Sequence, residues 1–185
     1  MLAYAAAIGF FYVGTFANIA AGPFVYIDYF GLSPTEYGLV FSSGVVGLMV
    51  ANVANVRAVA HIGSDRMLLL GAMGAALFGL ALVLAVITNL GGVWALIVTQ
   101  FLFNSMNGLI LANGVAGALS SITDRAGAAS AVVGAIQYGS GMIGSALVGL
   151  SANGTPLPMG IVIAAAGLGC LICAWRAVSN RAFLG

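Results

Sequence analysis

The sequence predicts an all-α polytopic membrane protein with six transmembrane helices, and three observations support this prediction. The chain of 185 residues is 62% hydrophobic and only 5% charged, whereas a soluble domain is typically about a quarter charged. The few charges separate apolar runs of roughly 20 residues, which at about 1.5 Å per residue cross a hydrocarbon core of about 30 Å. All five arginines fall on one side of a six-helix arrangement.

The first two spans have readable ends. Residues 2–26 form an apolar stretch longer than the hydrophobic region of a signal peptide, with no basic segment before it, so we expect a retained helix. Pro23 predicts a kink near its end. The second span, 34–59, opens with the pattern of a capping box, because Glu36 follows the capping residue Ser33 by three positions.

The remaining four spans are delimited by charges, glycines and prolines. Ser64 and Thr123 are expected to cap the third and fifth helices, each followed by an Asp in the first turn, where the helix dipole favours an anion. Thr155 and Pro156 open the sixth helix in the same way as the second. The six spans are therefore expected at residues 2–26, 34–59, 67–88, 93–119, 126–150 and 157–178, in a single bundle.

The arginines orient the predicted bundle. When the connections alternate between two faces, every arginine falls on the face of the N-terminus: Arg57, Arg66, Arg125, Arg176 and Arg181. Cytoplasmic segments of membrane proteins are enriched in Lys and Arg, so we expect both termini in the cytoplasm and the protein in the inner membrane of the cell. We assign topology and a cytoplasmic gate to Arg57, Asp65, Arg66, Asp124 and Arg125.

Amide side chains mark four of the six spans. Each amide can simply join two helices, at about 1 kcal/mol, but amides three, four or seven residues apart share a helix face. The third and sixth spans have no Asn, Gln or carboxylate in their interiors. This order of two polar spans and one apolar span, repeated, predicts two three-helix inverted repeats around a substrate cavity. The candidate cavity residues are Asn18, Asn52, Asn55, Gln100, Asn104, Asn107, Gln137 and Tyr138.

Small residues and cysteines are interpreted as packing elements. Two lines of small residues at four-residue spacing predict close helix contacts, namely Gly71, Ala75 and Gly79, and Gly141, Ser145 and Gly149. Cys170 and Cys173 lie inside an apolar run, where a redox role is disfavoured. Nothing in the sequence predicts a cofactor or a metal site, and a net charge of +1 gives no indication of a nucleic-acid partner.

Three segments carry a resemblance to a known family. They are GPFVYIDYFGLSPTEYGLVF, VRAVAHIGSDRMLLLG and AGALSSITDRAGAASAVVGAIQYGSGMIGSALVGL. In sequence and in order, these segments resemble the C-terminal six-helix half of Bcr/CflA-type drug exporters of the major facilitator superfamily. The resemblance covers residues 8–178.

The resemblance implies half of a twelve-helix major facilitator fold, with the amide-bearing spans around the cavity. Exporters of this type expel small amphipathic, drug-like molecules in exchange for protons. The chain is therefore expected to be the C-terminal half of a multidrug efflux antiporter, embedded in the lipid bilayer, and not an enzyme. The family's N-terminal half usually supplies the membrane-embedded carboxylates that take up the proton, and the interiors of the spans here contain none. We therefore expect inactivity without an N-terminal half.

Two other interpretations remain open at this point. The glycine lines and the lack of internal charge also fit a homodimeric six-helix facilitator or channel. An intramembrane protease is a remote alternative, because Ser120 or Ser140 would need a base within hydrogen-bonding reach. The only histidine, His61, lies in a connection predicted to be cytoplasmic.

Overall fold

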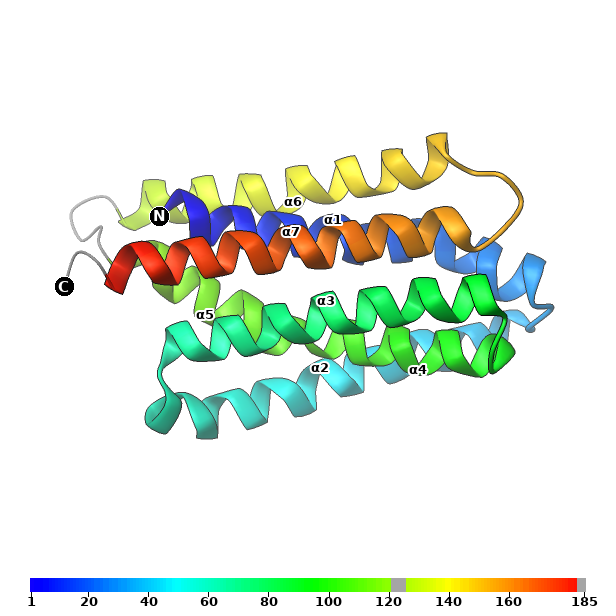
Figure 1. Cartoon of the computed structure of the whole chain (residues 1–185), viewed down its shortest axis with the longest axis horizontal. Helices are drawn as coiled ribbons and strands as arrows, with labels where there is room; N and C mark the ends of the chain where they lie inside the picture. The colour runs from blue at the N-terminus through cyan, green and yellow to red at the C-terminus, as the bar shows by residue number, and fades with distance from the viewer. Residues whose placement is uncertain (121–125, 183–185) are drawn as a thin grey trace.

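The computed structural model describes every residue of the chain except 121–125 and 183–185. The described residues form a bundle of long helices that run roughly in one direction, and the start of α1 and the end of α7 lie at the same end of it (Figure 1). In chain order the elements are α1 (Leu2–Pro23), the π-helix η1 (Phe24–Tyr29), α2 (Pro34–Ile62), α3 (Ser64–Thr88), α4 (Gly92–Ser105), α5 (Asn107–Leu119), α6 (Ala126–Leu150) and α7 (Leu157–Ala182).

The prediction of an all-α protein with six spanning helices is confirmed for the described residues. By length and composition, six stretches are able to cross a membrane: Leu2–Tyr29, Pro34–Ile62, Ser64–Thr88, Gly92–Leu119, Gly127–Leu150 and Leu157–Arg181. Four described arginines lie near helix ends at the same end of the bundle, which we call the arginine end. They are Arg57 near the end of α2, Arg66 at the start of α3, and Arg176 and Arg181 near the end of α7.

Pro23 changes the type of the first helix. Proline has no N–H and removes one backbone hydrogen bond from a helix. Here α1 ends at Pro23, and the chain continues as the wider π-helix η1, so the first span is extended to Tyr29. Gly31, with a φ of 74°, then turns the chain toward α2.

The start of α2 confirms the predicted capping box. The Glu36 backbone N–H donates to Ser33 Oγ at 3.3 Å, and the Ser33 backbone N–H donates to Glu36 Oε2 at 2.7 Å. Two N–H groups that the helix leaves without partners are thereby satisfied. At the start of α7, the Leu157 N–H donates to Thr155 Oγ1 at 3.3 Å, as the sequence suggested for this end.

The prediction that Ser64 caps the third helix is wrong. Gly63, with a φ of 86°, is the capping residue, and Ser64 is the first residue of α3. The Ser64 hydroxyl is instead used between helices, where it lies 3.0 Å from Oδ1 of Asn113. Asp65 does lie in the first turn of α3. The corresponding cap, Thr123, is outside the described residues.

The fourth span is interrupted, although a continuous helix over residues 93–119 was expected. α4 ends at Ser105 and α5 begins at Asn107. Between them the Met106 N–H donates to the carbonyl of Phe103, three residues back, at 3.1 Å, which tightens the turn. The break therefore lies between two of the predicted cavity residues, Asn104 and Asn107.

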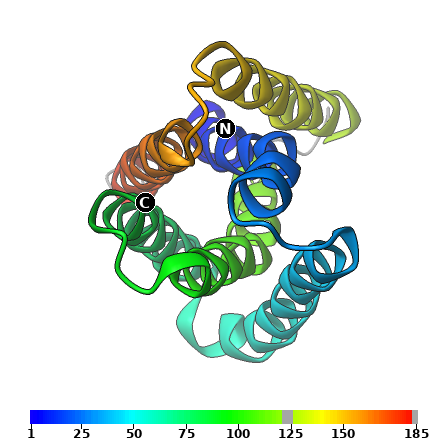
Figure 2. The same cartoon turned by 90° about the vertical axis from the view of Figure 1, so that its right-hand side faces the viewer.

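α1 is the central helix of the bundle. It packs most extensively against α6 and α7 and also contacts α5, while α3 packs along α7 (Figure 2). Its buried side chains include Ile8 and Phe11, and Phe11 stacks on Phe103 of α4 with ring centroids 5.0 Å apart. The core therefore runs along both faces of α1.

Small residues make the closest helix crossings, though not at every predicted position. A Cβ added at Gly144 would meet the backbone of Val13, and one added at Gly167 would meet the backbone carbonyl of Ala75 at 2.6 Å. Gly79 likewise lies against the backbone of Ala164. A Cβ added at Gly149, the last member of the second predicted line, would meet open space, so this glycine makes no close helix crossing.

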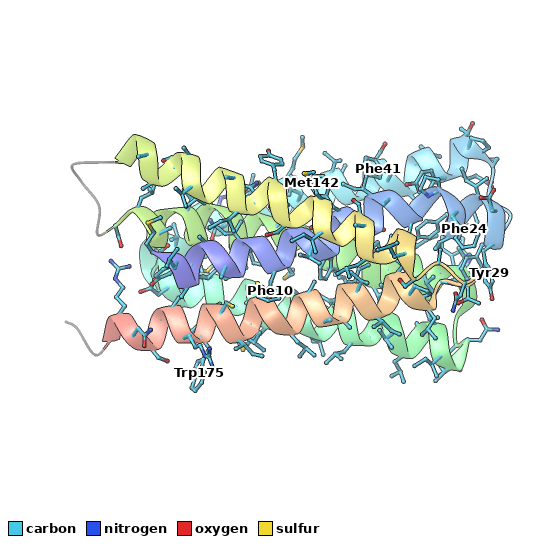
Figure 3. All side chains as sticks on the ribbon, turned by 90° about the horizontal axis from the view of Figure 1, so that it is seen from above. Phe10, Phe24, Tyr29, Phe41, Met142 and Trp175 are labelled. Carbon is cyan, nitrogen blue, oxygen red and sulfur yellow. The ribbon has the colours of Figure 1, made fainter. Side chains whose placement is uncertain are left out.

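Apolar side chains face outward on several helices. α3 and α7, predicted to face lipid, pack on each other and expose one apolar side each, and Figure 3 shows Trp175 pointing from α7 away from the bundle. α2 is the least buried span, with only Gly44, Gly47 and Asn55 buried. The outward residues of α2 include Val46, Met49, Val50, Val53 and Val56. The low burial of α2 was not predicted from the sequence.

Gly144→Ala is expected to destabilise the bundle by about 1 to 3 kcal/mol, because the new methyl group pushes against the backbone of α1. Thermal unfolding of the purified protein in detergent measures this effect. Gly139→Ala, in the same helix with nothing within 4 Å of the added Cβ, is the matched control. Equal unfolding temperatures for the two variants would contradict close packing at Gly144.

Candidate functional site

A polar cavity lies between α1, α2 and the fourth span. Its volume is about 130 Å³. The polar part of its lining comes from Thr15 and Asn18 of α1 and from Asn104 and Asn107 on the two sides of the helix break. Its apolar wall consists of Ile19, Phe41, Val45 and Leu48, with Gly44 between them. Three predicted cavity residues, Asn18, Asn104 and Asn107, are thus brought from two spans to one site.

A smaller inner chamber adjoins this cavity. The two share Asn18, Phe41, Gly44 and Asn104, and the chamber is further lined by Tyr26, Tyr37 and Gln100 among others. Its volume is about 20 Å³. Gln100 and Asn104 lie four residues apart on one helix face, so both amides reach the same space. Tyr26, which sequence reasoning did not select, comes from η1.

Gln137 and Tyr138 lie on the other side of α1. Gln137 is buried and Tyr138 is exposed. The hydroxyl of Tyr12 lies near the amides of Gln137 and Asn107. The rings of Tyr12 and Tyr138 stand edge to face, 6.0 Å apart. Tyr12 thus lies between Gln137 of α6 and Asn107, which lines the cavity. Its apolar sequence neighbours did not indicate this position.

Asn52 and Asn55 are separated from the cavity. Neither lines it, and Asn52 is exposed. Asn55 is buried and accepts a hydrogen bond of 2.7 Å from Nδ2 of Asn113, whose Oδ1 lies 3.0 Å from the Ser64 hydroxyl. These groups join α2, α5 and α3. Asn113, an amide inside an apolar span, was the sequence signal that our prediction of the site left out.

Asp65 forms a second polar cluster at the arginine end. The Tyr4 hydroxyl donates to Asp65 Oδ1 at 2.8 Å, and Nη1 of Arg181 lies 3.5 Å from the same oxygen. The cluster joins α1, α3 and α7. Arg57 and Arg66 are exposed. The other two predicted gate residues, Asp124 and Arg125, lie outside the described residues.

The electrostatics of the cavity come from neutral dipoles. Among the described residues, no Asp, Glu, Arg or His lines either the cavity or the inner chamber. The described carboxylates lie near the ends of spans, at Asp28, Glu36 and Asp65. Three or more His, Cys, Asp or Glu residues do not come together anywhere in the described part of the chain. The arrangement is thus able to bind by hydrogen bonds and apolar contact.

Comparison with known proteins points to one class of protein. The chain is 30% identical over 159 residues to a bicyclomycin resistance protein homolog of Haemophilus influenzae, covering 86% of this chain and 40% of that protein. It is also 30% identical over 166 residues to an uncharacterized MFS-type transporter of Bacillus subtilis, covering 88% of this chain and 40% of that one. The chain thus spans about 40% of the length of these relatives. No family model and no solved structure matches it.

Asn55 and Asn113 are expected to couple energetically, because each amide satisfies the other in an apolar environment. In a double-mutant cycle of Asn55→Ala and Asn113→Ala, we expect a coupling of about 0.6 kcal/mol, the average for hydrogen bonds between membrane helices. Unfolding in detergent provides the measurement. A cycle of Asn52→Ala with Asn113→Ala is the control and should give no coupling. Equal values in both cycles would show that Asn55 does not hold Asn113.

Proposed function

We propose that this chain, which resembles part of an MFS drug exporter, forms one six-helix half of a membrane exporter of small amphipathic molecules. The observation that carries the proposal is the neutral, amide-lined cavity inside an otherwise apolar six-helix bundle. The relatives support a role in transport rather than catalysis, since one is named a transporter and the other a resistance protein. The proposed location is the inner membrane.

The cavity is the proposed substrate site. Amides from α1 and the fourth span supply hydrogen-bond donors and acceptors, and Phe41 and its apolar neighbours supply a surface for a hydrophobic body. This combination suits an amphipathic molecule, because most of the binding area is apolar and a few polar groups set the orientation. The Tyr12, Gln137 and Tyr138 group is proposed to extend the site along α1.

Proton coupling is proposed to depend on a second six-helix half. Coupling requires a group that changes its charge with pH, and amides do not titrate. None of the described carboxylates lines the cavity. The share of the relatives' length that this chain covers, about 40%, leaves room for such a half.

The outward faces of α2 and α6 are the proposed contact surface for that half. Both helices stand at edges of the bundle (Figure 2), and both expose large apolar side chains, including Phe41 of α2, which also lines the cavity, and Met142 of α6, both labelled in Figure 3. Rocking of one half against the other would open the cavity to each side in turn. The clusters of Asp65 and Asn113 would keep this half rigid during that motion.

The arginine end is proposed to face the cytoplasm. In a background in which Cys170 and Cys173 are replaced by serine, Thr35→Cys is expected to react with a membrane-impermeant thiol reagent added to intact cells. His61→Cys is expected to react only after the cells are opened, because both positions are exposed but lie at opposite ends of α2. Labelling of His61→Cys in intact cells would show that the arginine end faces the outside of the cell, opposite to the proposal.

Transport is expected only from the paired halves. Membrane vesicles that contain this chain together with a matching N-terminal six-helix half should move bicyclomycin, the compound in one relative's name, in response to a pH gradient. The same vesicles treated with a protonophore should lose the flux, and vesicles with this chain alone should show none. Flux by the chain alone would favour a homodimeric facilitator, and native mass spectrometry in detergent would then reveal the dimer.

A further inference from the structure

We propose that Gln100, Tyr26 and Asn104 form a binding site for one uncharged group that both donates and accepts hydrogen bonds, such as a hydroxyl or a carboxamide. The site is the inner chamber next to the amide-lined cavity. This proposal rests on the proposed function in one respect: it takes the molecule that carries this group to be the transported substrate.

Gln100 is the central observation. Its side chain is buried, with 4% of its surface exposed, and neither the amide oxygen nor the amide nitrogen has a hydrogen-bond partner among the described residues. A buried polar group without a partner destabilises a fold, so proteins nearly always pair it. Asn113, further along the same span in α5, shows the usual solution, because its amide is paired on both sides. Gln100 therefore has the character of a group held for a ligand.

Two more groups share this property and the same space. The hydroxyl of Tyr26, a residue with only 1% of its surface exposed, and Oδ1 of Asn104 also lack partners in the described part of the chain. Together the three side chains offer a hydroxyl, an amide nitrogen and two amide oxygens around one chamber. The chamber thus presents hydrogen-bond donors and acceptors side by side, and a ligand group that itself donates and accepts hydrogen bonds is complementary to them.

The size and the charge of the chamber narrow the class of ligand. A volume of about 20 Å³ exceeds the roughly 10 to 15 Å³ that one water molecule needs, so the chamber admits a hydroxyl or the polar end of a carboxamide. An ammonium group of this size would lose its hydration without meeting a carboxylate, and a carboxylate would meet no arginine, since no described charged residue lines the chamber. A hydroxyl or a carboxamide meets partners for both its donor and its acceptor.

The adjoining cavity indicates what the rest of the ligand is. Ile19, Phe41, Val45 and Leu48 give it an apolar wall, and Gly44 borders both spaces. The ligand class is therefore a neutral amphipathic molecule with an aromatic or aliphatic body and a terminal hydroxyl or carboxamide. A single water molecule has the same hydrogen-bonding chemistry without the body, so the test must separate the two.

Equilibrium binding of two small probes to the full purified chain provides that test. Benzamide carries a neutral carboxamide on an aromatic ring, and benzylammonium carries a cation on the same ring. Ligand-observed NMR titrations measure both, which also suits weak binding. We expect Gln100→Met and Tyr26→Phe each to weaken benzamide binding by about two- to tenfold, the usual effect of one lost hydrogen bond. Benzylammonium binding should not change.

Matched variants and a stability measurement complete the experiment. Tyr29→Phe, at an exposed position of the same π-helix, should leave benzamide binding unchanged. Gly44→Ala should weaken it, because the added methyl group enters the cavity at ordinary contact distance, 3.5 Å from Asn104 Nδ2, whereas Gly38→Ala in the same helix meets open space and should not. Gln100→Met should not lower the thermal unfolding temperature, since the wild-type amide has no protein partner to lose.

Two results would overturn the proposal. Benzamide affinity that is the same in wild type, Gln100→Met and Tyr26→Phe would show that the chamber holds water only. A lower unfolding temperature for Gln100→Met with unchanged benzamide affinity would show that Gln100 has a structural role. Equilibrium binding requires neither a pH gradient nor a second half, so a failure of the vesicle transport assay leaves this result unaffected, and the reverse also holds.

Discussion

Every backbone N–H and C=O group inside a bilayer must find its partner within the protein, because hydrocarbon offers no hydrogen bonds. The continuous helices of this chain satisfy that constraint along their length. At two places where a helix is interrupted, other backbone hydrogen bonds replace the regular ones. At Pro23 the chain changes to a π-helix, and at Met106 a tighter turn keeps the backbone bonded across the break. Backbone N–H groups at the start of α2 are satisfied by Ser33 and Glu36, and one at the start of α7 by Thr155.

The same constraint divides the polar side chains into two groups. Asn55, Asn113 and Ser64 satisfy one another between helices, and so do Tyr4, Asp65 and Arg181. These groups act as structural links at the arginine end. The residues around the cavity do not form such closed sets, and Gln100 is left without a partner in the described part of the chain. Whether a polar side chain has a hydrogen-bond partner in the protein therefore distinguishes structural links from candidate binding groups better than its polarity alone.

Sequence reasoning succeeded where the signal was local. The six spans follow from apolar length, the start of α2 from the spacing of Ser33 and Glu36, and the common position of the described arginines from the helix count. It succeeded less with the site, because periodicity within one helix does not say which helix lies opposite. Asn55 was grouped with the cavity but pairs with Asn113, and Ser64 was expected as a cap but bonds across to α5.

The sequence by itself determined the class of the protein, the number of spans and the positions of their charges, since each depends on residues close together in the chain. Only the tertiary structure decided how the amides are used. It brought Asn18 to the same cavity as Asn104 and Asn107, which lie on the two sides of the helix break. It also brought Gln100 of α4 to the same chamber as Tyr26 of η1. The physical reason is that a hydrogen bond or a cavity depends on distances between helices, and these distances are set by small residues such as Gly144 and Gly167, whose contacts the sequence does not specify.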